Sequence, residues 1–201
     1  MNNLALALVF AAYNIVLAFL VPWVGGLYRK AYHDELTGAL NRRGGEKALA
    51  KQAKRFRKWK RRPTLGLAFI VFDLDNFKSI NDSHGHGAGD AVLQAAVQLV
   101  SDCCRSGDKL SRVANLARMG GEEFLLVLPG ASIEDAARIA ERMRAALDTH
   151  VYYGGTAPIK ISASFGVAHS RSVLQIRDAL ARADAALYLA KEGGRNHVVL
   201  A

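Results

Sequence analysis

The chain has 201 residues, 51% of them hydrophobic, and a formal net charge of +9. This length suffices for one domain with a real core plus a short appendage. Residues 29–62 hold thirteen Lys and Arg against three acids, whereas the chain from residue 63 onward is nearly neutral. A globular nucleic-acid binder would spread basic charge over its folded face, so we expect no nucleic-acid partner.

The first predicted element is an apolar helix. Residues 4–28 contain no charged side chain and only one strongly polar one, Asn14. A run of about 20 apolar residues is long enough to cross a bilayer, so we interpret residues 1–30 as a transmembrane anchor with a basic flank. A cleaved signal peptide and a buried core helix are weaker alternatives, because no basic segment precedes the run and no polar stripe divides it. Arg29 and Lys30 predict that the remaining chain is cytoplasmic.

The basic excess is densest over residues 47–62, which carry nine Lys or Arg and no acid. This pattern predicts a cationic helix beside the anionic inner leaflet of the membrane. The alternative is a solvated helix face that only reinforces the topology.

The elements of the first half of the domain follow from hydrophobic patterning. Residues 65–72 form a continuous apolar run, typical of a buried central strand. The stretch 81–89 is rich in turn-forming residues, and residues 90–104 place apolar side chains at helical spacing. The adjacent Cys103 and Cys104 belong to that helix, and we expect them to stay reduced and to pack in the core.

The second half continues the alternation of strands and helices. The predicted elements are a hairpin at Gly120-Gly121, a strand over 124–128, a helix from the capping residue Ser132 to about Leu147, a strand over 159–168 and a helix over 177–192. This order predicts an α/β or α+β fold in which helices pack on one sheet.

Two acidic clusters lie at the ends of predicted strands. Asp73 and Asp75 follow the first strand, and Glu122 and Glu123 precede the second. If the strands are neighbours, the carboxylates converge and repel one another unless a cation lies between them. Oxygen ligands without His or Cys favour Mg²⁺ over zinc.

Other residues are consistent with phosphate near this cluster. Gly120 and Gly121 allow close approach of the backbone, and Lys191 and Arg195 at the end of the last helix could neutralise phosphate charge. Each feature also has a plainer explanation: a surface turn, an ordinary hairpin, or basic residues that offset a helix dipole.

Five segments, taken together, resemble the GGDEF family of diguanylate cyclases and occur in the family's order. They are "DELTGALNRR" (34–43), "FDLDNFKSINDSHGHGAGD" (72–90), "RMGGEEF" (118–124), "SFGVA" (164–168) and "ADAALYLAKEGGRN" (183–196). The resemblance identifies residues 31–201 as a domain of this family. It implies a fold like that of nucleotide cyclases and polymerase palm domains. Together with the single apolar run, it predicts a location in a bacterial inner membrane with a single pass.

The resemblance also implies an activity: two GTP condense to cyclic di-GMP with release of two pyrophosphates. The reaction would need Mg²⁺ or Mn²⁺ and a homodimer, because one domain binds one GTP. The alternative is a catalytically silent module that binds GTP or cyclic di-GMP and signals through contact with a partner.

Matching positions imply the site residues. Asp73, the backbone carbonyl of Leu74 and Glu122 would bind metal, and Glu122 and Glu123 would be catalytic, Glu123 near the 3′-hydroxyl. Asn81 and Asp90 would recognise guanine. The phosphate-binding residues would be Lys78, Lys191 and Arg195, with backbone N–H groups near Asn76 and Phe77.

The chain departs from the family pattern before the signature. The inhibitory Arg-x-x-Asp pair of many members would fall on Ser111 and Ala114, so the usual site is absent. The segment "RSGD" at 105–108 makes Arg105 and Asp108 a candidate product-inhibition site. Eleven residues separate it from Gly120, which corresponds to an apparent six-residue insertion, so either the site survives with a longer connection or the match is accidental. No sensory domain fits between the apolar run and residue 34, so the sequence does not identify a regulator.

Overall fold

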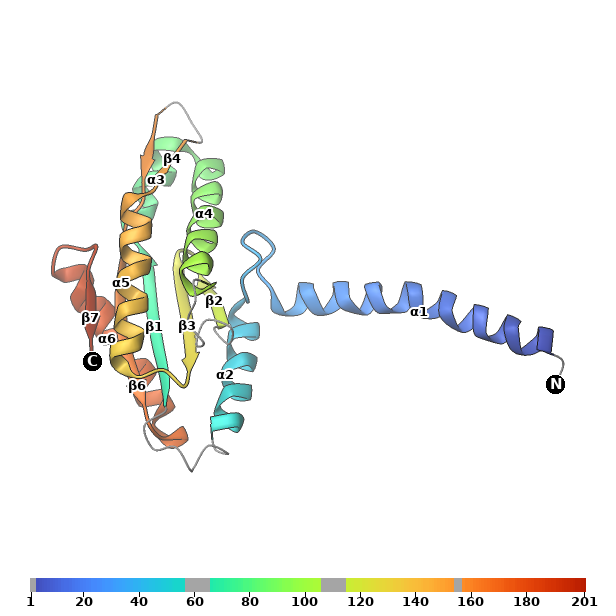
Figure 1. Cartoon of the computed structure of the whole chain (residues 1–201). Coiled ribbons are helices and arrows are strands. Elements are labelled where there is room, and N and C mark those ends of the chain that lie inside the picture. The colour runs from blue at the N-terminus through green and yellow to red at the C-terminus, as the bar shows by residue number, and fades with distance from the viewer. Residues whose placement is uncertain (1–2, 57–65, 106–114, 154–156) are drawn as a thin grey trace.

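The computed structural model describes residues 3–56, 66–105, 115–153 and 157–201 and has a long N-terminal helix that projects from an α+β domain (Figure 1). This helix, α1, spans Asn3–Tyr32. Its segment Phe10–Tyr32 is the one helical stretch in the described part of the chain that is long and apolar enough to cross a membrane. Most of its large apolar side chains are exposed, as Phe19 and Trp23 illustrate.

The domain is built on a five-stranded sheet with the order β2-β3-β1-β6-β7. The strands are β1 (Leu67–Leu74), β2 (Asn115–Gly120), β3 (Glu123–Pro129), β6 (Ala163–Ser170) and β7 (Val198–Leu200). β1 lies at the centre, antiparallel to both β3 and β6, and β7 pairs parallel to β6. Every residue of β1 is buried, which confirms the predicted central strand.

Helices cover both faces of the sheet. Their bounds are α2 (Arg42–Phe56), α3 (Phe77–His84), α4 (His86–Arg105), α5 (Ile133–Thr149) and α6 (Ile176–Glu192). Successive side chains of a strand point to opposite faces, so β1 contributes Ile70 and Phe72 to a core with α4 and α5. Phe69 and Val71 pack on the other face with α6 and α2.

Three sequence predictions need correction. Asp73 lies inside β1 rather than after it, because the ladder with β3 and β6 continues through this residue. The strand predicted over 159–168 divides into β5 (Ile159–Lys160), which pairs with β4 (Val151–Tyr152), and β6, which pairs with β1. Pairing partners in space, rather than apolar alternation, set that division.

The third correction concerns the stretch 81–89, which is mostly helical rather than turn. α3 ends at His84, and α4 begins four residues earlier than predicted, after Gly85 with φ of 81°. Gly89 contacts the Asn81 side chain so closely that a Cβ would lie 1.9 Å from Oδ1. Packing between the two helices therefore compensates for the low helix propensity of the glycines.

The helices predicted from Ser132 to about Leu147 and over 177–192 are confirmed by α5 and α6. Ser132 and Asp135 form a reciprocal capping box at the start of α5, in which each side chain accepts from the other residue's backbone N–H. Cys103 and Cys104 are buried on α4, as expected.

Candidate active site

Three elements meet at Asp73 near the end of the central strand. Asp73 is the Cα partner of Glu123 on β3 and of Ser164 on β6. Directly opposed residues of antiparallel strands project to the same face, so Asp73 and Glu123 share the face that α6 covers. From the end of α6, Lys191 Nζ reaches within 2.9 Å of Asp73 Oδ1.

The signature residues form the two-residue turn between β2 and β3. Gly120 pairs with Glu123, which leaves Gly121 and Glu122 in the turn. Gly121 has φ of 53°, a left-handed conformation that favours glycine. The N–H of Leu74 donates to the Glu122 carbonyl at 3.3 Å, so the turn is attached to the end of β1. The predicted hairpin and the predicted neighbouring strands are thus both confirmed.

Negative charge accumulates around Asp73, whose side chain is buried. Burial raises the pKa of the Asp73 carboxyl, the Lys191 ammonium opposes this shift, and the charges of Glu122 and then Glu123 add to it. Oxygen donors of this kind suit a hard divalent cation. No cluster of three His, Cys, Asp or Glu side chains that could hold a metal occurs among the described residues; Mg²⁺ is usually held by one or two carboxylates plus phosphate, so the smaller donor set still fits it.

Asp75, two residues further along, has a different environment. Its buried carboxylate accepts hydrogen bonds from Ser162 Oγ at 2.8 Å, Ser164 Oγ at 2.7 Å and the Asn196 N–H at 3.0 Å. These bonds attach the segment after α6 to the end of β1. Sequence reasoning did not identify these partners, although two serines at alternating positions opposite an acidic strand end were a usable signal.

The residues expected to contact guanine lie together at the junction of α3 and α4. The Asn81 side chain contacts Gly89, which adjoins Asp90 at the start of α4. Asn81 is partly buried and Asp90 is exposed, so both positions border solvent.

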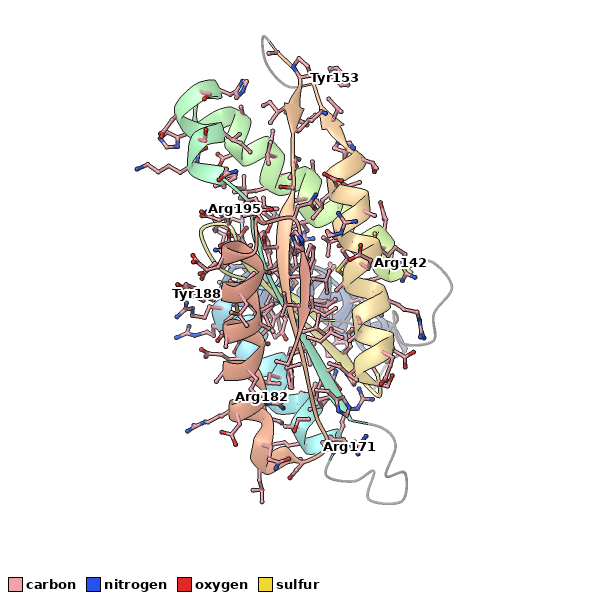
Figure 2. All side chains as sticks on the ribbon, turned by 90° about the vertical axis from the view of Figure 1, so that its left-hand side faces the viewer. Arg142, Tyr153, Arg171, Arg182, Tyr188 and Arg195 are labelled. Carbon is pink, nitrogen blue, oxygen red and sulfur yellow. The ribbon has the colours of Figure 1, made fainter. Side chains whose placement is uncertain are left out.

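The phosphate-binding candidates lie at the ends of helices. Asn76 has φ of 53° and precedes α3, whose first residue, Phe77, is buried and anchors the helix against the core, while Lys78 is exposed. Arg195 has φ of 65° and lies just beyond α6, where its N–H donates to the Ala190 carbonyl at 3.1 Å (Figure 2). The roles of these residues toward GTP stay predictions.

The first motif supports the signature turn, a contact that sequence reasoning did not predict. Arg118 Nη1 lies 3.1 Å from Asp34 Oδ1, and Arg118 Nε donates to the Gly121 carbonyl at 2.7 Å. Arg42 Nε donates to the Met119 carbonyl at 3.0 Å. Burial alone would raise the pKa of Asp34, but hydrogen bonds from Thr37 and the ion pair with Arg118 lower it.

A hollow of about 430 Å³ lies between α2, the hairpin and α6. Glu123 and Lys191 line it together with Asp184 and Tyr188 of α6. Burial, followed by the charge of Glu123, raises the pKa of Asp184. This volume therefore adjoins the Asp73 site.

The candidate product-inhibition pair falls at a boundary of the described residues. Arg105 is the last residue of α4, and Asp108 lies outside the described residues.

The family assignment rests on sequence comparison. Residues 31–197 match the family described as diguanylate cyclase, GGDEF domain. Diguanylate cyclase A of Treponema denticola is 38% identical over 136 residues, covering 67% of this chain and 35% of that protein. Diguanylate cyclase DgcM of Escherichia coli K12 is 36% identical over 179 residues, covering 87% of this chain and 40% of that protein. The chain thus spans less than half the length of these curated relatives.

Solved structures agree with this assignment. The coiled coil and GGDEF domain of DgcB from Caulobacter crescentus, in complex with c-di-GMP, has a TM-score of 0.81 at 25% identity and covers 98% of this chain and 100% of that one. Diguanylate cyclase SiaD of Pseudomonas aeruginosa, in complex with its activator SiaC, has a TM-score of 0.77 at 30% identity and covers 98% of this chain and 72% of that one. The chain therefore belongs to the GGDEF-domain family of diguanylate cyclases.

Proposed function

We propose that this chain is a membrane-anchored diguanylate cyclase that condenses two GTP into cyclic di-GMP and two pyrophosphates. The observation that carries the proposal is the meeting of a buried Asp73, the signature turn and Lys191 in one place. The chain's relatives that bear the name diguanylate cyclase support the same reaction.

In this proposal the carboxylates hold a divalent cation. Asp73, Glu122 and the Leu74 carbonyl would bind Mg²⁺ or Mn²⁺, which would supply positive charge next to the phosphate oxygens. The raised pKa of Asp73 reflects burial and the nearby charges of Glu122 and Glu123, all of which favour uptake of a positive charge.

The other residues position GTP. Lys191 is paired with Asp73 and could release that carboxylate to bind a phosphate oxygen instead. Arg195 lies four residues further along, beyond the end of α6. The Asn81 amide can both donate to and accept from the guanine edge, whereas the Asp90 carboxylate accepts from the N1–H and N2–H₂ donors, a pair that adenine lacks. Most of the catalytic effect then comes from placement and charge neutralisation.

Two domains must face each other, because one domain supplies one GTP. We propose a homodimer in which α1 raises the local concentration of the domains in the membrane. The match to a DgcB structure that contains a coiled coil supports a pairing role for α1, because it extends over 98% of this chain.

The proposal is tested with the full chain purified in nanodiscs and incubated with GTP and Mg²⁺, with products identified by mass. Glu122→Gln is expected to lower cyclic di-GMP formation on the order of a hundredfold, because an amide cannot replace the carboxylate charge. Glu192→Gln, at the end of α6, is the control and should keep normal turnover. If the dimeric wild-type chain binds GTP without forming any cyclic di-GMP, the silent-module alternative is correct.

A further inference from the structure

Helix α2 has a basic face and a buried face. Arg43, Lys47, Lys51 and Lys54 are exposed and follow one another at spacings of four, four and three residues, which places them along one side of the helix. Arg55 is exposed beside Lys54. The opposite side packs on the sheet through Leu49 and Ala53 and carries the buried residues Gly45 and Gln52. Gly44 is buried against the backbone of Tyr32 at the end of α1.

The basic face (Arg43, Lys47, Lys51, Lys54 and Arg55) lies where the chain leaves the long apolar helix. In Figure 1, α1 projects sideways from the domain, and α2 runs along the adjacent flank, across the direction of α1. If α1 crosses a bilayer, α2 therefore extends along the membrane surface rather than away from it. Residues 57–62 of the predicted basic segment lie outside the described residues and are not needed for this geometry.

Two tyrosines at the end of α1 indicate where α2 lies relative to the membrane–water interface. Trp and Tyr concentrate at membrane–water interfaces, and Tyr28 and Tyr32 pack against each other at the end of α1, with ring centroids 4.7 Å apart. Lys47 Nζ lies 3.8 Å from the ring centroid of Tyr32 and 4.9 Å from that of Tyr28. This contact places the first half of α2 at the level of the aromatic belt, where lipid headgroups lie.

We propose that the basic face of α2 binds anionic phospholipid headgroups of the membrane that α1 crosses. The proposal rests on the membrane anchoring proposed above. A hollow of about 510 Å³ lined by Lys47, Ala50, Lys51, Lys54 and Arg55 offers room for phosphate groups on this face. Glu46 is the one acid within α2, so positive charge dominates the helix and complements an anionic surface.

This contact has a consequence for the enzyme. Arg42, at the start of α2, donates to the Met119 carbonyl in the signature hairpin. Lipid bound along α2 therefore fixes the orientation of the domain, and with it the signature turn, relative to the membrane. Two domains that are held in the same orientation to the membrane are restricted in how they can face each other. Formation of the dimer therefore depends on the anionic lipid content of the membrane.

The test uses the full wild-type chain in nanodiscs of phosphatidylcholine alone or with phosphatidylglycerol. Lysine reactivity toward a water-soluble acylating reagent is measured by mass spectrometry. We expect phosphatidylglycerol to lower the reactivity of Lys51 and Lys54 about fivefold, because contact with an anionic headgroup shields the ammonium group from the reagent. Lys160, exposed on β5, is the control within the same sample and should not change. Equal reactivity of Lys51 and Lys54 in both nanodiscs would overturn the proposal.

A variant pair separates this contact from general charge effects. Lys51→Glu with Lys54→Glu should abolish the response of cyclase activity to phosphatidylglycerol, whereas Lys160→Glu with Arg177→Glu, an equal charge change at exposed positions, should preserve it. Protection of Lys51 by a duplex oligonucleotide but not by phosphatidylglycerol would assign the face to nucleic acid and contradict the proposal. Resistance of the chain to alkaline carbonate extraction is scored separately, so a failure of anchoring is distinguishable from a failure of lipid binding.

Discussion

Asp73 and Asp75 lie two positions apart at the end of β1, but their surroundings differ, and so do the roles that they can have. Asp75 accepts three hydrogen bonds from Ser162, Ser164 and Asn196, which satisfies its charge within the protein. Asp73 is paired with one ammonium group and is crowded by two further carboxylates. Asp75 is therefore a structural residue, whereas the Asp73 carboxylate is the one that can bind a cationic ligand.

Asp75→Ala should destabilise the domain strongly. The substitution leaves the buried Ser164 hydroxyl, the partly buried Ser162 hydroxyl and one backbone N–H without their acceptor, so we expect a loss of about 3 kcal/mol in the free energy of unfolding. Denaturant titration measures the loss, and Glu192→Ala at the exposed end of α6 is the matched control, with little change expected. A loss no larger than that of the control would show that the three bonds contribute little.

His169 makes stability depend on pH. Burial lowers the pKa of His169, Arg171 lowers it further, and Glu134 opposes the shift. Nε2 is buried without a hydrogen-bond partner among the described residues, and Gly66 packs so closely that a Cβ would lie 2.1 Å from it. Because the folded-state pKa lies below the ordinary value of 6.5, the unfolded chain takes up the proton first as the pH falls.

Stability should therefore fall as the pH drops through 6.5, and the fall should be shallower in His169→Gln, which cannot titrate. Thermal unfolding of both proteins between pH 8 and pH 5 provides the measurement. Parallel curves for the two proteins across this range would contradict the assignment.

At the scale of elements, the segment before α2 extends the sheet and supports the signature hairpin. The N–H of Leu40 donates to the Leu116 carbonyl at 3.0 Å, and the N–H of Arg118 donates to the Leu40 carbonyl at 2.7 Å. The side chain of Arg118 then joins Asp34 to the Gly121 carbonyl. The segments 34–43 and 118–124 thus support each other directly, although about eighty residues separate them in the chain.

Arg118→Ala should weaken both stability and turnover. Its ion pair with Asp34 is mostly buried, so we expect a loss of about 2 kcal/mol, together with reduced cyclic di-GMP formation because the turn is no longer held. Arg138→Ala removes an exposed pair with Asp135 and should cost less than about 1 kcal/mol with normal turnover. Normal turnover in Arg118→Ala would exclude a positioning role for the arginine.

Local patterning predicted the elements whose signals are local. The capping box of α5 appears at the predicted residues, and the central strand β1 and the last helix α6 lie within two residues of their predicted bounds. The predictions of one strand over 159–168 and of a turn over 81–89 were wrong, because both structures depend on partners elsewhere in the fold. Residues 163–170 pair with β1 as a separate strand. Packing of α3 on α4 stabilises helix in the glycine-rich stretch.

At the scale of the whole molecule, the described structure is a domain joined to a long apolar helix. α1 contacts the domain at its C-terminal end, where the Asn41 side chain donates to the Ala31 carbonyl at 3.2 Å and Lys47 of α2 lies on Tyr28 and Tyr32. The helix otherwise projects free of the domain, so its exposed apolar side chains are available to lipid or to a second copy of α1 (Figure 1).

Removal of residues 1–30 should make activity depend on protein concentration. Without α1 the two domains meet only by diffusion, so specific activity at nanomolar protein should fall on the order of a hundredfold below that of the full chain in nanodiscs. Micromolar truncated protein, which restores pairing by mass action, is the control and should recover activity. Undiminished activity at nanomolar concentration would contradict the role given to α1.

The sequence by itself determined the family, the apolar helix and the identities of the acids at the strand ends, because motif order, run length and residue type are properties of the chain alone. Only the tertiary structure decided that Lys191 pairs with Asp73, that Asp75 is satisfied by two serines and that Arg118 connects the first motif to the signature turn. These contacts join residues far apart in the chain, and they form only because the sheet order and the packing of α6 bring those residues together in space.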